Sequence, residues 1–309
     1  MNTTDSLKSK LQGELSYQNP QYLVETDWLE RHLDDANLRI FDCSAAPAQN
    51  PDLALRKSFP VRPIKVRDPY DKEHIPGAVF LDVPGELADS SRQFPMMMPP
   101  GEQFVETMSQ YGVNDDSRVV LYSTTREIWP ARVLWMLRAV GFDKVAILNG
   151  GWTKWASEKR PVSSTQSIYP RGQLTLRSRP GVFVGKEEVQ KAIEDKRVPL
   201  IHALSAKQFS GESGPVFKRK GRIPGSINIP SGRLTDPDTG TYLPAPELRQ
   251  LFEPLDIEQA GSVITYCGGG VNASSNALAL VLLGYENISV YDGSLNEWGN
   301  DHSLPVETE

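Results

Sequence analysis

Residues 263–273 read VITYCGGGVNA, and this stretch indicates both the fold and the place where chemistry occurs. The run from Val263 to Tyr266 consists of β-branched and aromatic residues, which is typical of a strand buried in a sheet. Three glycines follow Cys267, and an apolar helical pattern then runs from Ala273 to Leu283. A buried strand that turns directly into a helix predicts an α/β fold.

The signals around this stretch occur twice in the chain, which is the mark of an internal repeat. Residues 199–202, 221–226, 263–266 and 288–291 have counterparts, in the same order, at residues 39–43, 73–78, 119–122 and 145–148. Gly150 and Trp155 lie five residues apart, as do Gly293 and Trp298. We therefore predict two homologous α/β domains, each an open, mainly parallel sheet flanked by helices.

The length of 309 residues also favours two domains. Residues 163–179 are rich in Ser, Gln, Arg and Pro, a composition typical of a linker. We expect an N-terminal domain over residues 20–162, this linker over 163–179 and a C-terminal domain over 180–309.

Composition excludes several classes of function. A formal net charge of -6 and a pI near 5.4 argue against a nucleic-acid partner. No apolar run approaches the roughly 18 residues that span a membrane, and residues 1–19 lack the pattern of a secretory signal. We expect a cytoplasmic protein with no membrane partner. The two cysteines are far apart and the four histidines lack metal-ligand spacing, so we expect no disulfide or metal site. There is no Walker motif, and the run of three glycines is better explained by the cysteine loop than by a dinucleotide turn, so we expect no nucleotide or flavin.

The loop after the predicted strand favours an anionic sulfur on Cys267. Gly268, Gly269 and Gly270 can take positive φ, so the backbone N–H groups can curl around the sulfur. The positive end of the following helix acts in the same direction. Both effects favour thiolate over thiol and suit a persulfide, whose outer sulfur is also anionic. We predict that Cys267 is the catalytic nucleophile and that the loop extends through Val271 and Asn272.

These residues resemble the tandem rhodanese family of thiosulfate and 3-mercaptopyruvate sulfurtransferases. Residues 74–78 and 222–226 are similar to its paired HIPGA turns, and Tyr291 through Trp298 is similar to its closing signature. The resemblance implies a sulfurtransferase that moves a sulfane sulfur from a small anionic donor to cyanide, a thiol or a protein acceptor. It also implies a nucleophile in the C-terminal domain alone.

The first domain fits that asymmetry, because Ser123 stands where the second domain has Cys267. For the loop of residues 123–130 we expect a structural role in closing the first domain, beside the cleft between the domains. Cys43 ends a predicted strand that no glycine loop follows, so we predict a buried structural thiol.

The chain departs from the family pattern at several positions. The uncharged loop is closer to the mercaptopyruvate type, but Gly269 and Asn272 replace its two hydroxyl residues, which leaves the donor open. His202 and Leu204 stand where the family usually has Asp and Arg. At the position where the family has a substrate-binding arginine, the resemblance places Gln208 in this chain. The neighbouring Lys207 is a candidate replacement for that arginine.

A basic cluster, residues 218–222, precedes the second turn. Arg219 and Arg222 are candidates for steering an anionic donor, although a solvated loop explains the cluster equally well. His74, in the first turn, is a further candidate whose alternative role is structural.

Other classes remain as alternatives. Dual-specificity phosphatases have a related fold, but their longer loop ends in an arginine that grips phosphate, whereas this loop has Asn272. A cysteine hydrolase lacks a recognisable histidine partner here. A non-catalytic persulfide carrier or partner-binding module stays open because of the departures at His202, Leu204 and Gln208.

Overall fold

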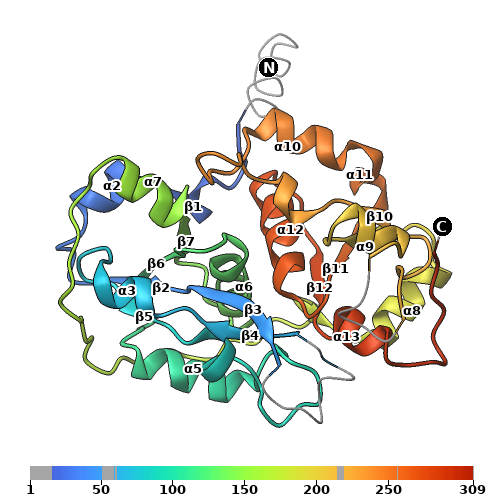
Figure 1. The fold of residues 1–309 in the computed structure, drawn as a ribbon, viewed down its shortest axis with the longest axis horizontal. Coiled ribbons are helices and arrows are strands. Elements are labelled where there is room, and N and C mark those ends of the chain that lie inside the picture. Colours follow the sequence, from blue (N-terminus) through green and yellow to red (C-terminus); the bar gives the residue numbers. More distant parts are fainter. Residues whose placement is uncertain (1–15, 51–58, 60, 214–218, 256, 309) are drawn as a thin grey trace, which may run out of the picture.

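The computed structural model describes residues 16–50, 59, 61–213, 219–255 and 257–308. Within these residues each half of the chain forms one five-stranded parallel sheet covered by helices (Figure 1). No helix of this part of the chain has the length and apolar character needed to cross a membrane.

The first sheet has the strand order β1-β7-β6-β2-β5, and all its pairs are parallel. Its strands are β1 (Leu23–Val24), β2 (Leu38–Asp42), β5 (Val79–Phe80), β6 (Arg118–Tyr122) and β7 (Val145–Leu148). The helices of this half are η1 (Pro20–Tyr22), α2 (Thr26–Arg31), α3 (Asp68–Lys72), α4 (Val83–Glu86), α5 (Gly101–Gln110), α6 (Ile128–Ala139) and α7 (Gly151–Ser157).

The second sheet has the order β10-β9-β11-β12-β8, again entirely parallel. Its strands are β8 (Phe183–Val184), β9 (Leu200–His202), β10 (Ile227–Asn228), β11 (Val263–Tyr266) and β12 (Ile288–Tyr291). The helices of this half are α8 (Lys186–Glu194), α9 (Ala206–Ser210), η3 (Ser231–Arg233), α10 (Ala245–Phe252), η4 (Glu253–Leu255), α11 (Ile257–Ala260), α12 (Val271–Leu282) and α13 (Ser294–Trp298).

The two sheets have the same topology. Read from the other edge, the first is β5-β2-β6-β7-β1, so each strand occupies the place of its sequence counterpart in the second. In both turns the glycine after proline has positive φ, 81° at Gly77 and 74° at Gly225. The predicted fold of two mainly parallel α/β domains is confirmed.

An antiparallel hairpin in the first domain lies outside the repeat. Its strands are β3 (Ala45–Gln49) and β4 (Val61–Lys65), and Pro47 lies opposite Pro63. Proline cannot donate a ladder hydrogen bond, so neither segment is typical of a strand in the sequence. The hairpin extends from the end of β2 towards the second domain (Figure 1).

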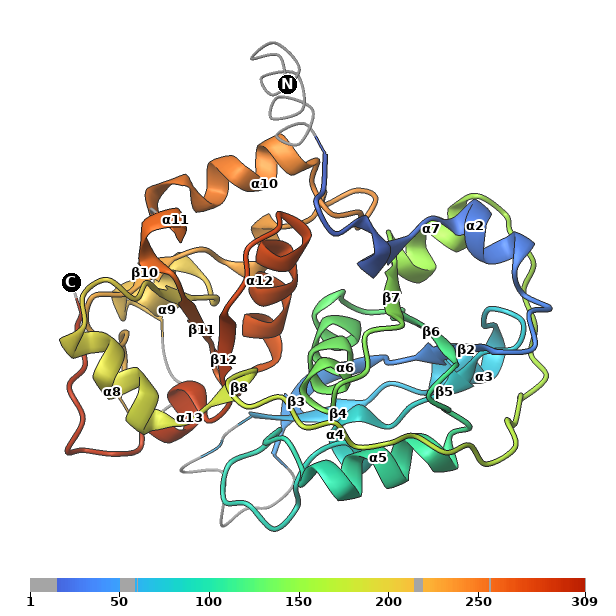
Figure 2. The ribbon, with the colours of Figure 1, turned by 180° about the vertical axis from the view of Figure 1, so that it is seen from behind.

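The central helices of the two halves, α6 and α12, pack against each other (Figure 2). Each follows the middle strand of its own sheet, β6 or β11. A single cluster of buried apolar residues contains members of both helices, including Val133, Leu137, Ala277 and Leu280. The two domains are therefore held together by buried apolar surface as well as by the chain that connects them.

The segment predicted as a linker is held along the first domain. The Tyr169 hydroxyl donates to the carbonyl of Gly77 at 2.7 Å and accepts from the Ile40 amide at 3.1 Å. Further along, Arg177 pairs with Asp115 at 2.7 Å. The limits of 20–162, 163–179 and 180–309 stay a prediction, but this segment does not cross open solvent between the domains.

Candidate active site

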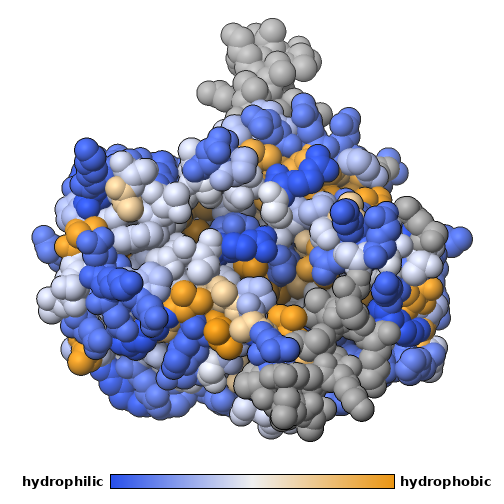
Figure 3. Space-filling model, in the orientation of Figure 1, coloured by the Kyte–Doolittle hydropathy of each residue, from blue (hydrophilic) through white to orange (hydrophobic). Residues whose placement is uncertain are grey.

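A pocket of about 560 Å³ lies where the two domains meet. The first domain contributes the β3–β4 hairpin, the segment at Met96 and the start of α6, and the second contributes the ends of β9 and β11 with the loops that follow. Figure 3 shows apolar residues gathered at a hollow between the domains. The pocket wall is largely apolar.

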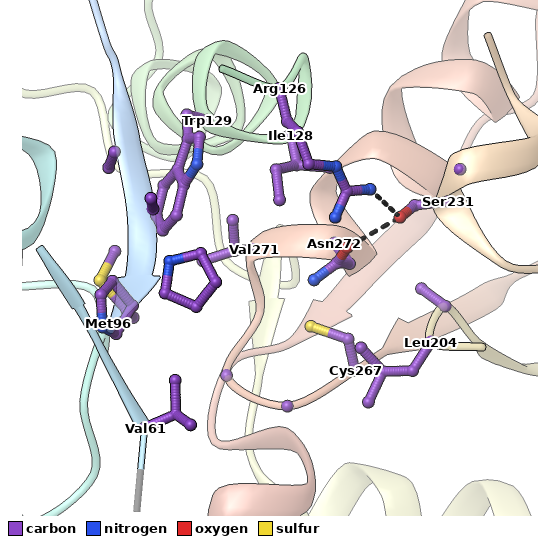
Figure 4. Close-up of a pocket in the computed structure, with 18 of the residues that line it drawn as sticks. Val61, Met96, Arg126, Ile128, Trp129, Leu204, Ser231, Cys267, Val271 and Asn272 are labelled. Carbon is purple, nitrogen blue, oxygen red and sulfur yellow. Dashed lines mark hydrogen bonds between the residues drawn. The ribbon is translucent and has the colours of Figure 1, made fainter. Parts of the chain in front are cut away.

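Cys267 follows the last residue of β11 and its sulfur points into this pocket (Figure 4). The residue is only 1% exposed, so a donor reaches the sulfur through the pocket. Ser294 fixes the loop: its hydroxyl accepts from the amides of Cys267, at 3.1 Å, and Gly270, at 3.2 Å. The same hydroxyl donates to the Tyr291 carbonyl at 2.6 Å, which anchors the loop to β12.

The remaining amides of the loop are available to an anion. No acceptor among the described residues pairs with the N–H groups of Gly268, Gly269, Val271, Asn272 and Ala273. Unpaired amides at the start of a helix form an anion-binding site together with the helix dipole. The structure thus leaves unpaired hydrogen-bond donors in the loop that follows Cys267 and in the first turn of α12.

Gly270 has to be glycine for two reasons. Its φ is 74°, and a Cβ placed on it would lie 2.6 Å from Nη1 of Arg132 and 3.1 Å from Oδ1 of Asp292. The loop therefore sits directly on these two side chains.

We expect Gly270→Ala to destabilise the protein by about 1–3 kcal/mol and to lower activity, because strain and a clash act at the same residue. Gly225→Ala is the matched control: Gly225 has the same φ of 74°, but nothing lies within 4 Å of its added Cβ. Thermal unfolding of both variants separates the clash from the backbone strain. Equal losses in the two variants would show that the contact with Arg132 does not matter.

Arg132 and Asp292 form a buried ion pair across the domain interface. Their nearest charged atoms are 2.7 Å apart, and the Arg132 side chain is fully buried. Arg132 donates to the Met96 carbonyl at 2.5 Å, while the second carboxylate oxygen of Asp292 accepts from the Met98 amide at 2.7 Å. Helix α6 of the first domain thus places a cation beneath the Cys267 loop.

Asn272 takes part in a short chain of hydrogen bonds. Its Oδ1 accepts from the Ser231 hydroxyl at 2.8 Å, and that hydroxyl accepts from Nη2 of Arg126 at 3.4 Å. Figure 4 shows this chain beside Cys267. Although Gly269 and Asn272 carry no hydroxyl, Ser231 brings one to the edge of the loop from another segment.

The two candidates Gln208 and Lys207 differ in their position relative to the pocket. Gln208 lines the pocket, but its Oε1 accepts from the Ser205 hydroxyl at 2.9 Å, within the capping box of α9. Lys207 is exposed and is not among the described residues that line the pocket. The position that the resemblance gives to a substrate-binding arginine is therefore occupied by a capping residue.

Two residues of the basic cluster, Arg219 and Arg222, contact other parts of the second domain and do not line the pocket. Arg219 donates to the carbonyls of Leu304, at 2.7 Å, and Trp298, at 2.8 Å. Arg222 lies 4.4 Å from the ring of Phe209 and 3.5 Å from the Glu307 carboxylate. Both guanidinium groups are thus engaged away from Cys267, and Lys218 lies outside the described residues.

His74 is fully buried in the first domain and does not line the pocket. Its Nδ1 lies 2.7 Å from the Tyr70 carbonyl and its Nε2 lies 3.1 Å from the Thr165 carbonyl. These contacts tie α3 to the segment after residue 162, which favours the structural role.

Cys43 is a buried free thiol, as predicted. Burial, and then the nearby Asp42 carboxylate, raise the pKa of Cys43 well above its usual value. Its sulfur is therefore a poor nucleophile.

His202 is also buried, at the end of β9, and its ring packs edge-on against Phe209 and Tyr266. Burial, more than the nearby Arg222 charge, lowers the pKa of His202 from 6.5 to about 4. This side chain is neutral at neutral pH and cannot replace the family's usual acidic residue as a charge.

We expect His202 to make stability fall as pH is lowered. Between about pH 6.5 and pH 4 the unfolded chain binds a proton at this ring that the folded chain does not, so acid favours unfolding. Urea unfolding at several pH values should show a shallower acid loss for His202→Phe than for the wild type. The comparison between variant and wild type is needed because burial raises the pKa of Asp42 to about 6. The folded chain then binds a proton at Asp42 more readily than the unfolded chain, which makes stability rise as pH falls. Parallel pH profiles would contradict the expectation.

Several residues of the pocket were not among the predicted site residues. Arg126 and Trp129 belong to the loop for which we expected a structural role beside the cleft, and both line the pocket. The proline-containing hairpin contributes further wall residues, among them Val61 and Pro63. The closeness of these segments to Cys267 depends on how the domains dock, which no local pattern encodes.

Comparison with known proteins agrees with the fold. The model of the rhodanese-like domain matches residues 25–158 and 185–301. The 3-mercaptopyruvate sulfurtransferase of Escherichia coli is 32% identical, over 93% of this chain and 98% of that protein. The sulfur carrier protein TtuD of Thermus thermophilus is 31% identical, over 94% and 98%. The crystal structure of SseA from Escherichia coli, a 3-mercaptopyruvate sulfotransferase, superposes with a TM-score of 0.75 at 30% identity, over 88% of this chain and 98% of that one.

The chain therefore belongs to the rhodanese family, with two copies of the rhodanese-like domain. It is a sulfurtransferase.

Proposed function

We propose that Cys267 accepts a sulfane sulfur from a small anionic donor in the pocket, holds it as a persulfide, and passes it to cyanide or a thiol. The observation that carries this proposal is the sulfur of Cys267 at the pocket wall, at the start of a helix whose first amides are unpaired. The other cysteine, Cys43, is buried in the first domain, away from the pocket.

With thiosulfate the cycle has two displacements. The Cys267 thiolate attacks the outer sulfur, the bond between the two donor sulfurs breaks, and sulfite leaves with the electron pair. The acceptor then attacks the outer sulfur of the persulfide, and the thiolate of Cys267 leaves. The same amides that stabilise the thiolate stabilise the anionic outer sulfur of the intermediate.

The donor class follows from the relatives and from the pocket. An Arabidopsis thaliana relative, 33% identical over 92% of this chain and 86% of its own, is named thiosulfate/3-mercaptopyruvate sulfurtransferase 2. For this chain we propose donors of these two kinds. The loop itself is uncharged, so the anion is held by backbone amides and by residues from outside the loop.

The test is intact mass after incubation with thiosulfate or 3-mercaptopyruvate. The protein should gain about 32 mass units, located on the peptide that contains Cys267, and lose them when cyanide is added. A Cys43→Ala protein serves as control and should behave as the wild type. Sulfur on Cys43, or no mass gain from either donor, would overturn the assignment. Loading without turnover would favour the carrier function over the enzyme.

A further inference from the structure

Charge is scarce in the pocket. Of the described residues that line it, Arg126 alone carries a charged side chain, and the others are apolar, glycine or neutral polar residues. Wall residues on both sides of the cleft are apolar, including Met96, Ile128, Trp129 and Leu204. A ligand that fills the pocket therefore meets one cation and a large apolar surface.

Arg126 is placed to bind an anion. Its guanidinium has one hydrogen bond, the long 3.4 Å contact to the Ser231 hydroxyl. Among the described residues the neighbouring Glu127 carboxylate interacts with it electrostatically, but from beyond ion-pair distance. The side chain is exposed at the pocket, so its remaining N–H groups are free to pair with a ligand. Figure 4 shows it on the same side of the pocket as Asn272 and Cys267.

We propose that Arg126, from the domain without the nucleophile, binds the anionic end of the sulfur donor, and that the pocket selects donors with one negative charge on an apolar body over dianionic thiosulfate. This inference rests on the persulfide mechanism proposed above. It gives the first domain a direct part in substrate recognition.

The selectivity follows from charge and size. One guanidinium neutralises one charge. The backbone amides of the Cys267 loop carry no net charge, so a second charge on the donor would be desolvated against side chains such as Trp129 and Met96 without a counter-ion. A volume of about 560 Å³ is also far larger than an inorganic ion of a few atoms requires. An aromatic or aliphatic group attached to the reacting end fills this space and packs on Trp129.

Benzenethiosulfonate is the matched probe, because it replaces one charged oxygen of thiosulfate by a phenyl ring. The Cys267 thiolate attacks its outer sulfur, the sulfur–sulfur bond breaks, and benzenesulfinate leaves with the electron pair. The products are the Cys267 persulfide and a monoanion, so charge and electrons balance without a further reactant. The reaction therefore differs from that of thiosulfate in the body of the donor and not in the bond broken.

The experiment compares kcat and KM for the two donors, with cyanide as acceptor. We expect the wild type to have at least a ten-fold higher kcat/KM for benzenethiosulfonate. Arg126→Gln should raise its KM by about ten- to hundred-fold and change kcat less than two-fold. Arg126→Lys should recover part of the loss, because it keeps the charge. Arg233→Gln is the control, since Arg233 is an exposed arginine of η3 outside the pocket lining.

The outcomes separate this proposal from the mechanism on which it rests. An unchanged KM in Arg126→Gln, an equal loss in the Arg233→Gln control, or a wild-type preference for thiosulfate would overturn the proposal, while the persulfide on Cys267 would stand. A wild-type protein that gains no sulfur mass from either donor would overturn both.

Discussion

Replacing Cys267 by serine is expected to lower sulfur transfer by about a thousand-fold or more and to abolish the persulfide mass gain. Serine keeps the shape of the side chain and the loop contacts through Ser294, but a hydroxyl is neither ionised at neutral pH nor able to hold a sulfane sulfur as a persulfide. The loss should therefore appear in kcat with every donor, because the bond-forming atom itself is missing.

The control for this experiment is Cys43→Ser. That thiol is fully buried in the first domain and is not among the described residues that line the pocket, so transfer should stay within about two-fold of the wild type. Thermal unfolding of both variants shows whether any loss of activity reflects folding. A folded Cys267→Ser protein with substantial activity would refute the mechanism, because the structure offers no second thiol at the pocket within its described residues.

Replacing Arg132 by methionine is expected to destabilise the protein by about 3–5 kcal/mol, because it leaves the Asp292 carboxylate buried without its counter-ion. The pair lies at the domain interface beneath Gly270, so the loss should also loosen the Cys267 loop. Urea or thermal unfolding measures the first effect, and persulfide loading measures the second.

A double variant tests whether the buried charge is the cause. Asp292→Asn removes the charge but keeps an oxygen for the Met98 amide, so Arg132→Met with Asp292→Asn should be more stable than Arg132→Met alone. Arg171→Met is the surface control: its bidentate contact with Glu106 is exposed, and little change is expected. A double variant less stable than Arg132→Met would show that the carboxylate is not the source of the loss.

The repeat and the position of Cys267 between a strand and a helix were predictable because both depend on local patterns. A run of β-branched residues ends at Tyr266, glycines follow, and a helix begins, so the strand, the loop and the anion-binding amides are all specified within residues 263–273. The order of such signals, given twice, was enough to predict two equivalent sheets.

Which residues outside the loop lie near Cys267 was not predictable in the same way. The sequence placed the basic candidates at Arg219 and Arg222, because like charges close together in the chain resemble a binding patch. In the structure Arg219 donates to the carbonyl of Trp298, the last residue of α13, as a helix end attracts a cation, and to the carbonyl of Leu304. Arg222 packs on Phe209. Their proximity in sequence to the turn carried no information on their distance from Cys267.

The sequence by itself determined the two parallel α/β domains and a cysteine set in a glycine loop, since strand burial, positive φ and the helix start are local properties of the chain. Only the tertiary structure decided what surrounds that cysteine. Docking of α6 against α12 buries Arg132 under Gly270 and brings Arg126 to the pocket, and these contacts depend on the packing of two surfaces far apart in the sequence. The local setting of Cys267 is therefore encoded in its own segment, whereas the donor site that we propose lies at the interface between the domains.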